Sequence, residues 1–359
     1  MSSSAASTVS RGIWSNVAKR SPSLTIQNPA LRAALLSPTL PNGPVSMKTK
    51  LSKSRYHSPV DLDKIYPLAY QMLEAESEKM YKKVEEIDSK LESIKDDSEL
   101  KQLKQEKEQL LVDAELNNPE VLYNGLYGTT HVDRSQPVYR HYLKEQWKSY
   151  NRMLTMQRLE SLSVIPDTLP TLEPEVHVQL KFPHNNVETW VEPGTILSSN
   201  VTSKPPIFEI VEFKESINDL YTVLIVNPDT PDVENDTFTT TLDWGLKHVW
   251  LSNTDSIIDV KKLDSHPEYS LVEYLPPVPE KNLGKQRFAV WVFRQDGKLE
   301  EMISKIESRE NFNIRKYVED NKLHAVGAHV WRSIYDLNVD NVRDEYGLPE
   351  GRIFTRGFF

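Results

Sequence analysis

The 359-residue sequence predicts a mainly β protein with α-helices: an antiparallel β-sandwich preceded by a helical extension. Three observations lead to this fold class. Apolar residues repeat at helical spacing before residue 165, a proline-rich stretch occupies residues 165–175, and short alternating or β-branched runs follow it. We therefore expect a helical extension at residues 61–165 and a sandwich domain at residues 166–340.

The helical extension begins with a stripe of apolar residues spaced alternately by four and three. The stripe comprises Met80, Val84, Ile87, Leu91 and Ile94, and a second one follows with Leu100, Leu103 and Leu110. This spacing is typical of helices that pack along one face. It predicts a helical hairpin or a short coiled coil, followed by a loop-rich connector at residues 117–137.

A third helix is predicted at residues 138–162. Its apolar stripe consists of Leu143, Trp147, Tyr150 and Leu154. Basic residues recur every fourth position on a neighbouring face, at Arg140, Lys144, Lys148 and Arg152. Two interpretations remain open: a solvated face whose side chains extend to water, or a ridge that contacts phosphates.

The sandwich domain is predicted from strands at residues 176–182, 220–228, 246–253, 287–295 and 324–336, and from a strand, a turn and a second strand within residues 191–210. Turn-forming residues separate most of these runs, as in antiparallel sheets. A helix is expected at residues 307–323. The last segment, residues 341–359, is predicted to be an irregular tail.

Charge is distributed unevenly along the chain, because all 52 acidic residues lie beyond Val60. The first residues are rich in Ser and contain Arg, and Val9, Ile13, Trp14 and Val17 can share one helical face. This pattern is typical of a mitochondrial transit peptide, which we place at residues 1–45; the alternative is a disordered tail. Residues 46–60 form a basic arm that suits nucleic-acid phosphates.

Several motifs of the sandwich domain resemble those of the phosphatidylethanolamine-binding-protein family. The family's Asp-Pro-Asp-x-Pro motif stands here as Asn227-Pro228-Asp229-Thr230-Pro231, and its Gly-x-His-Arg-Tyr motif as Gly284-Lys285-Gln286-Arg287-Phe288. The family's pocket histidine matches His248. The resemblance implies a pocket for a small anion at the end of a central strand.

This chain departs from the family pattern at the pocket itself. Asn227 replaces a carboxylate, Gln286 replaces a histidine, and Pro276-Pro277-Val278-Pro279-Glu280 replaces a glycine-rich loop. These changes remove a titratable hydrogen-bond donor. They also remove the glycines that would let the backbone approach an anion closely. We therefore expect an eroded pocket, with Asp229 as a turn cap and His248 as a hydrogen-bonded core residue. The vestigial pocket comprises Asn227, Pro228, Asp229, Pro231, His248, Gln286 and Arg287.

The segments "NNPEVLYNGLYG", "QPVYRHYLKEQW" and "MLTMQRLESLSVIPDTLPTL" are similar to fungal members of a family of mitochondrial large-ribosomal-subunit proteins. This resemblance implies a structural constituent of the matrix ribosome, near the central protuberance, with the large-subunit rRNA and neighbouring ribosomal proteins as partners. The candidate RNA contacts are Lys48, Lys50, Lys53, Arg55, Arg140, Lys144, Lys148, Arg152, Arg352 and Arg356. The alternative is a mitochondrial phospholipid- or anion-binding module, or a kinase-regulating one.

Other chemistry has little support in the sequence. There is no Cys, and the nine His residues lack metal-ligand spacing. No phosphate-binding loop, nucleophile elbow or membrane span is evident. We therefore expect no enzyme, cofactor, metal or small-molecule ligand.

The tail ends with Ile353, Phe354, Phe358 and Phe359. Soluble proteins seldom leave a cluster of large apolar side chains of this kind exposed to water. We expect the tail to pack into a neighbouring protein or RNA groove, with Phe358 and Phe359 as anchors; the alternative is that the aromatic rings fold back onto the tail's own domain.

Overall fold

The computed structural model describes residues 12–15, 20–36, 62–91, 97–127, 132–183, 189–215, 219–295, 297, 306 and 308–355. The chain divides into two compact units, Met1–Leu143 and Lys144–Phe359. We call them the N-terminal unit and the C-terminal unit.

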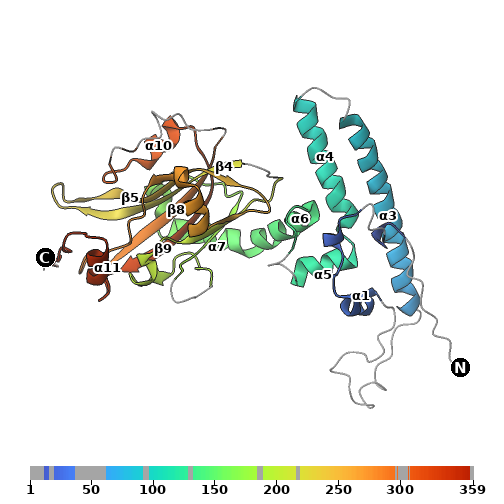
Figure 1. Ribbon diagram of the computed structural model, residues 1–359, viewed down its shortest axis with the longest axis horizontal. Helices are drawn as coiled ribbons and strands as arrows, with labels where there is room; N and C mark the ends of the chain where they lie inside the picture. The colour runs from blue at the N-terminus through green and yellow to red at the C-terminus, as the bar shows by residue number, and fades with distance from the viewer. Residues whose placement is uncertain are drawn as a thin grey trace, which may run out of the picture. The chain divides into compact units, whose positions relative to one another are not determined.

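The N-terminal unit is built on a pair of long helices. Helices α3 (Leu62–Leu91) and α4 (Asp97–Glu115) lie side by side and run in opposite directions (Figure 1). Two residues of the predicted apolar stripe, Val84 and Ile87, are buried. The helical hairpin expected from the sequence is therefore present.

Further helices complete this unit. Helix α5 (Pro119–Tyr127) lies within a segment for which we predicted a loop-rich connector. Proline at the first helical position suits the helix start, since its missing N–H would have no partner there. Segments η1 (Ile13–Ser15), η2 (Pro22–Leu24) and α1 (Pro29–Leu36) lie within the predicted transit peptide, and several of their side chains are buried.

The third predicted helix is interrupted. It consists of α6 (Pro137–Gln146), a π-helical turn η4 (Trp147–Asn151) and α7 (Arg152–Ser161), followed by the short α8 (Val164–Asp167). The π-helical turn shifts the faces after it relative to those before it, so a four-residue spacing does not continue as one straight stripe.

The boundary between the units differs from the predicted one at residues 165–166. Leu159 of α7 is buried in the C-terminal unit, as are Leu169 and Leu172 of the proline-rich stretch. The stretch is therefore a covering layer of the sheet domain and not a free linker.

The C-terminal unit contains two sheets. The smaller has the order β1 (His177–Lys181), β3 (Ile207–Val211), β6 (Ile257–Ile258). The larger has the order β2 (Ile196–Leu197), β9 (His324–Ile334), β8 (Lys285–Gln295), β4 (Asp219–Asp232), β5 (Thr237–Leu251), β7 (Ser270–Val272). Within the two sheets, the described strand pairs are antiparallel except β2 with β9.

Both faces of the large sheet are buried. Tyr221, Val223 and Ile225 of β4 face the small sheet, where Phe208 and Ile210 join them. The sheets approach closely at Gly327, where an added Cβ would lie 2.6 Å from the Val178 side chain. The predicted antiparallel sandwich is thereby confirmed.

The opposite face of the large sheet is covered by helices. Leu224 and Val226 of β4 lie in a cluster with Leu159 of α7 and with Ile314 and Tyr317 of α10 (Ile314–Asp320). Because side chains alternate along a strand, β4 serves both cores at once. This explains why its apolar run is continuous.

Short helices complete the C-terminal unit: η5 (Val201–Ser203), α9 (Val260–Ser265), η6 (Pro267–Tyr269) and α11 (Val339–Glu345). Helix α11 lies in the region that the sequence assigned partly to the irregular tail. No described helix is long and apolar enough to cross a membrane.

Candidate functional site: a closed pocket and a basic helix

The predicted pocket lies at the corner where β4 leaves the centre of the large sheet. Asn227 caps this turn, because its Oδ1 accepts the backbone N–H of Asp229 at 2.9 Å. The Asp229 carboxylate accepts the backbone N–H of Arg287 at 2.8 Å and its Nε at 2.9 Å. The prediction that Asp229 caps the turn is therefore wrong: Asn227 does so, and Asp229 holds Arg287.

Arg287 connects this corner to the segment after α7. Its Nη1 donates to the carbonyl of Leu162 at 2.8 Å and to Oδ2 of Asp167 at 2.8 Å. Hydrogen bonding to Asp229 raises the pKa of Arg287 above its ordinary value, against the opposing effect of burial, and Asp167 adds to the rise. The guanidinium is thus a permanent charge between two carboxylates.

The residues that replace the family's titratable groups also bond to the corner. Asn227 Nδ2 donates to Oε1 of Gln286 at 3.4 Å, and Gln286 Nε2 donates to the carbonyl of Asp229 at 3.3 Å. Pro228 is buried and Pro231 is half-buried at the same corner. The polar groups that could have surrounded an anion are therefore used within the protein.

His248 lies elsewhere on the sheet. The register of β5 shifts so that Lys247 and His248 lie opposite Thr222, whereas Asn227 pairs with Thr241. A strand advances about 3.3 Å per residue, so the distance along β4 from Thr222 to Asn227 is roughly 16 Å. His248 has a φ of 55° at this bulge and is half-buried. Its predicted place in the pocket is therefore wrong.

The loop that replaces the family's glycine-rich segment binds the tail of the same chain. Oε2 of Glu280 accepts the backbone N–H of Arg352 at 2.9 Å. Lys281 forms a parallel bridge with Ile353, and its carbonyl accepts the N–H of Phe354 at 3.1 Å. The described part of the tail thus folds back onto its own domain, which is the alternative that the sequence left open; the predicted anchors Phe358 and Phe359 lie outside the described residues.

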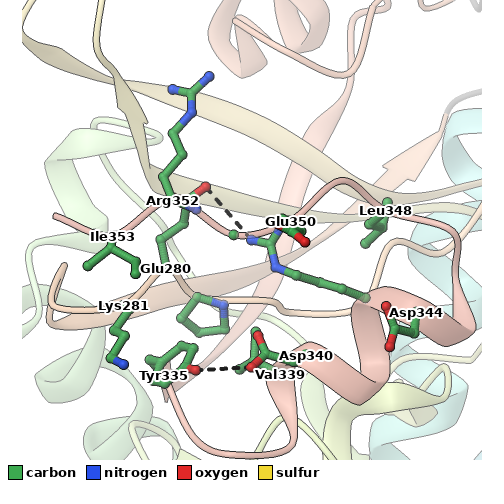
Figure 2. Close-up of a pocket in the computed structure, with 13 residues that line it drawn as sticks. Glu280, Lys281, Tyr335, Val339, Asp340, Asp344, Leu348, Glu350, Arg352 and Ile353 are labelled. Carbon is green, nitrogen blue, oxygen red and sulfur yellow. Dashed lines mark hydrogen bonds and ion pairs between the residues drawn. The ribbon is translucent and has the colours of Figure 1, made fainter.

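A groove of about 430 Å³ lies between this loop, α11 and the tail (Figure 2). Its wall carries four carboxylates, those of Glu280, Asp340, Asp344 and Glu350. They outnumber the three cationic side chains there, and Arg343 already donates to the carbonyl of Pro349 at 2.7 Å. This charge balance disfavours an anion, and no group of His, Asp and Glu in the described residues is arranged to hold a metal ion.

The basic residues of the third helix do not form a single stripe. Arg140 is 3% exposed, forms an ion pair with Glu108 and donates to the carbonyl of Ser135 at 2.7 Å. Its predicted role as an RNA contact is therefore wrong, because the side chain is enclosed in the N-terminal unit. Lys144 is half-buried and Lys148 is exposed, 3.0 Å from Glu145.

Some of the remaining RNA-contact candidates are described by the structure, and the others lie outside its described residues. Arg152 is half-buried with its guanidinium 5.9 Å from the centre of the Trp147 ring, and Arg352 is exposed. The predicted contacts Lys48, Lys50, Lys53, Arg55 and Arg356 lie outside the described residues. The structure therefore leaves Lys144, Lys148, Arg152 and Arg352 as candidates within its described part.

Two buried titratable residues were not singled out in the sequence. Burial raises the pKa of Asp243 well above its ordinary value, with Arg309 opposing the rise. Burial lowers the pKa of His329 to about 4, and its Nε2 lies 3.0 Å from the carbonyl oxygen of Val191. Neither is recognisable in the sequence, because each lies in a strand whose neighbours appear only in the folded sheet.

Comparison with known proteins gives matches to a family model and to curated proteins. The family model described as phosphatidylethanolamine-binding protein matches residues 187–332. The large ribosomal subunit protein mL38 of Schizosaccharomyces pombe is 32% identical over 274 residues, which cover 76% of this chain and 82% of that protein.

The solved structures that are similar to this chain include the following two, each covering about half of it. A phosphatidylethanolamine-binding protein from Plasmodium vivax has a TM-score of 0.39 at 18% identity, over 51% of this chain and 98% of that one. The carboxypeptidase Y inhibitor in complex with its cognate proteinase has a TM-score of 0.40 at 15% identity, over 51% and 95% of the two chains.

The match to mL38 extends over three quarters of the chain, more than the sheet domain alone could supply. The matched family model falls within the C-terminal unit, whose two sheets form the expected sandwich. The chain therefore belongs to the mL38 family of large-ribosomal-subunit proteins, and its C-terminal unit contains a phosphatidylethanolamine-binding-protein domain.

Proposed function

We propose that this protein is a structural constituent of the mitochondrial large ribosomal subunit, located in the matrix near the central protuberance. It contacts rRNA and neighbouring ribosomal proteins, and it needs no small-molecule ligand. The observation that carries the proposal is the match to mL38 over 274 residues. A role in assembly and not in catalysis follows, because the matched relative is named as a ribosomal protein.

The closed corner at Asp229 supports the absence of a ligand. A phosphate needs several unused donors or a positive group directed at it. Here Arg287 and Gln286 both donate to Asp229. An incoming anion would have to break these hydrogen bonds and compete with the Asp229 carboxylate for the same donors. The free energy lost in this way would exceed the free energy gained by binding an anion at an exposed site.

Sedimentation of a mitochondrial lysate tests the ribosomal part of the proposal. We expect the protein to migrate with the large subunit on a gradient in high salt, which removes loosely bound proteins by screening. Migration with the soluble proteins at every salt concentration would contradict the proposal.

Titration calorimetry tests the absence of a ligand. Phosphorylethanolamine and inorganic phosphate would each be titrated into the full chain, and we expect no heat of binding. Binding of either compound at micromolar affinity would instead favour the alternative, a phospholipid- or anion-binding module.

A further inference from the structure

The described residues of the predicted transit peptide, 12–15 and 20–36, belong to the folded N-terminal unit. Trp14 is only 1% exposed, and its indole Nε1 donates to Oγ of Ser77 at 3.0 Å. Its ring meets that of Tyr70 edge-on, with centroids 5.1 Å apart. Its backbone N–H donates to the Glu74 carboxylate at 3.1 Å. A ring of this size contributes a large apolar area to the core.

Arg20 forms a second anchor. Its side chain is 1% exposed, and its Nη2 donates to the Glu115 carboxylate at 2.7 Å, while Nε donates to the other oxygen of the same group. Arg20 also donates to the carbonyl of Trp14. The remaining donors to Glu115 are neutral: the hydroxyl of Tyr81 at 2.5 Å and the amide of Asn118 at 2.8 Å.

A third anchor lies on α5. Glu120 is 2% exposed and accepts the backbone N–H of Ile26 at 2.9 Å. It also forms an ion pair with Arg32 at 3.0 Å. Leu24, two residues before Ile26, packs in a buried cluster with Val121, Val138 and Tyr139.

These anchors share one pattern. Three buried carboxylates from the helices, those of Glu74, Glu115 and Glu120, take hydrogen bonds or ion pairs from a segment without any acid of its own. Removing the segment would leave Glu115 and Glu120 without their cationic partners and would uncover the apolar surface beneath Trp14 and Leu24. Breaking a buried ion pair by removing one partner is strongly destabilising.

We infer that the segment from Trp14 to Arg32 is retained in the mature protein as part of its fold, and that any presequence cleavage falls upstream of Trp14. The absence of acids then serves the fold, because an acid in this segment would face three carboxylates. The inference concerns processing and stability, and it rests on the proposed function only in taking the mitochondrion as the place of processing.

The first test is mass spectrometry of the N-terminal peptide of the protein isolated from mitochondria. We expect the mature chain to begin at or before Trp14. A mature N-terminus at any later residue would overturn the inference. The result is independent of ribosome binding, which the sedimentation experiment measures separately.

The second test uses the full recombinant chain and two matched substitutions, Leu24→Ala and Leu35→Ala. Leu24 is 4% exposed, whereas Leu35 of the same segment is 37% exposed. Hydrogen exchange of α5 and α6 amides should become about tenfold faster or more in Leu24→Ala and should stay unchanged in Leu35→Ala. Equal exchange in the two variants would show that the segment does not support the fold, and would also overturn the inference.

Discussion

At the scale of single residues, the corner at Asp229 is braced by ion pairs. Its central group is Arg287, which joins Asp229 of β4 to Asp167 of α8. An arginine suits this position because its planar fork reaches two carboxylates and a carbonyl at once. The corner thus holds the covering segment after α7 onto the sheet.

Arg287→Ala should lower the free energy of unfolding by about 2 kcal/mol, because Asp229 would lose its cationic partner and two of its hydrogen-bond donors in a half-buried position. Urea unfolding followed by tryptophan fluorescence measures the change. The control is Lys285→Ala, an exposed base on the same strand. Equal stability of the two variants would contradict the bracing role.

His329 should make the domain sensitive to acid. Its folded-state pKa of about 4 lies below the ordinary value of 6.5, so the unfolded chain binds its proton first as the pH falls. The stability from neutral His329 is complete above about pH 6.5 and is lost toward pH 4, by about 2 kcal/mol at pH 5. His329→Gln, which keeps a donor for Val191, should reduce the loss between pH 7 and pH 5. An identical loss in the variant would contradict this assignment.

At the scale of elements, the basic helix must be divided into buried and exposed charges. Arg140 supports the N-terminal unit, whereas Lys144 and Lys148 remain accessible to a partner. Lys144→Glu with Lys148→Glu should weaken association with the large subunit about tenfold if these side chains contact phosphates. The protein's far-UV circular dichroism should not change.

The matched control for this variant is Lys285→Glu with Lys316→Glu, which alters net charge equally at exposed positions of the C-terminal unit. Arg140→Glu should instead impair folding, because it would place a carboxylate beside that of Glu108 in a buried position. Normal association of the Lys144 and Lys148 variant at all salt concentrations would mean that the helix face is only solvated.

The C-terminal tail should stabilise its own domain. Deleting residues 353–359 removes the hydrogen bonds that Phe354 makes with Lys281 and Asn282. The melting temperature of the C-terminal unit should fall by about 3 °C. A second truncation that removes only residues 356–359 separates this effect from the rest of the tail. Unchanged melting in the longer deletion would restore the view that the tail serves only a partner.

The strands and long helices were predictable because their signals are local. The apolar run of β4 and the apolar stripe of α3 are each visible in a single short window of sequence. Helix α5 was missed because Asn, Gly and Pro around it favour loops. The π-helical turn after Trp147 was missed because residue spacing alone does not reveal an extra residue in a helix.

The candidate site was predictable only where the relevant residues are adjacent in sequence. The replacements at Asn227 and Gln286 could be read directly from the motifs. The place of His248 could not, because the bulge in β5 changes the register between strands. The anchoring of Trp14 was also hidden, since an acid-free segment has the same composition whether it targets the chain or packs on buried carboxylates.

At the scale of the whole molecule, the chain combines a phosphatidylethanolamine-binding-protein domain with a helical unit. The match to mL38 extends beyond the region of the phosphatidylethanolamine-binding-protein model. The proposed ribosomal role therefore depends on surfaces outside the former pocket. The acidic composition beyond Val60 would restrict the proposed RNA contacts to basic positions, since phosphates would be repelled by the acidic ones.

The most direct measurement of the central claim is the ratio of large to small mitochondrial ribosomal subunits after depletion of this protein. A structural constituent of the large subunit should be required for its assembly. We therefore predict that large subunits fall on a sucrose gradient while small subunits remain, and that re-expression of the wild-type chain restores the ratio. An unchanged ratio after complete depletion would contradict the account.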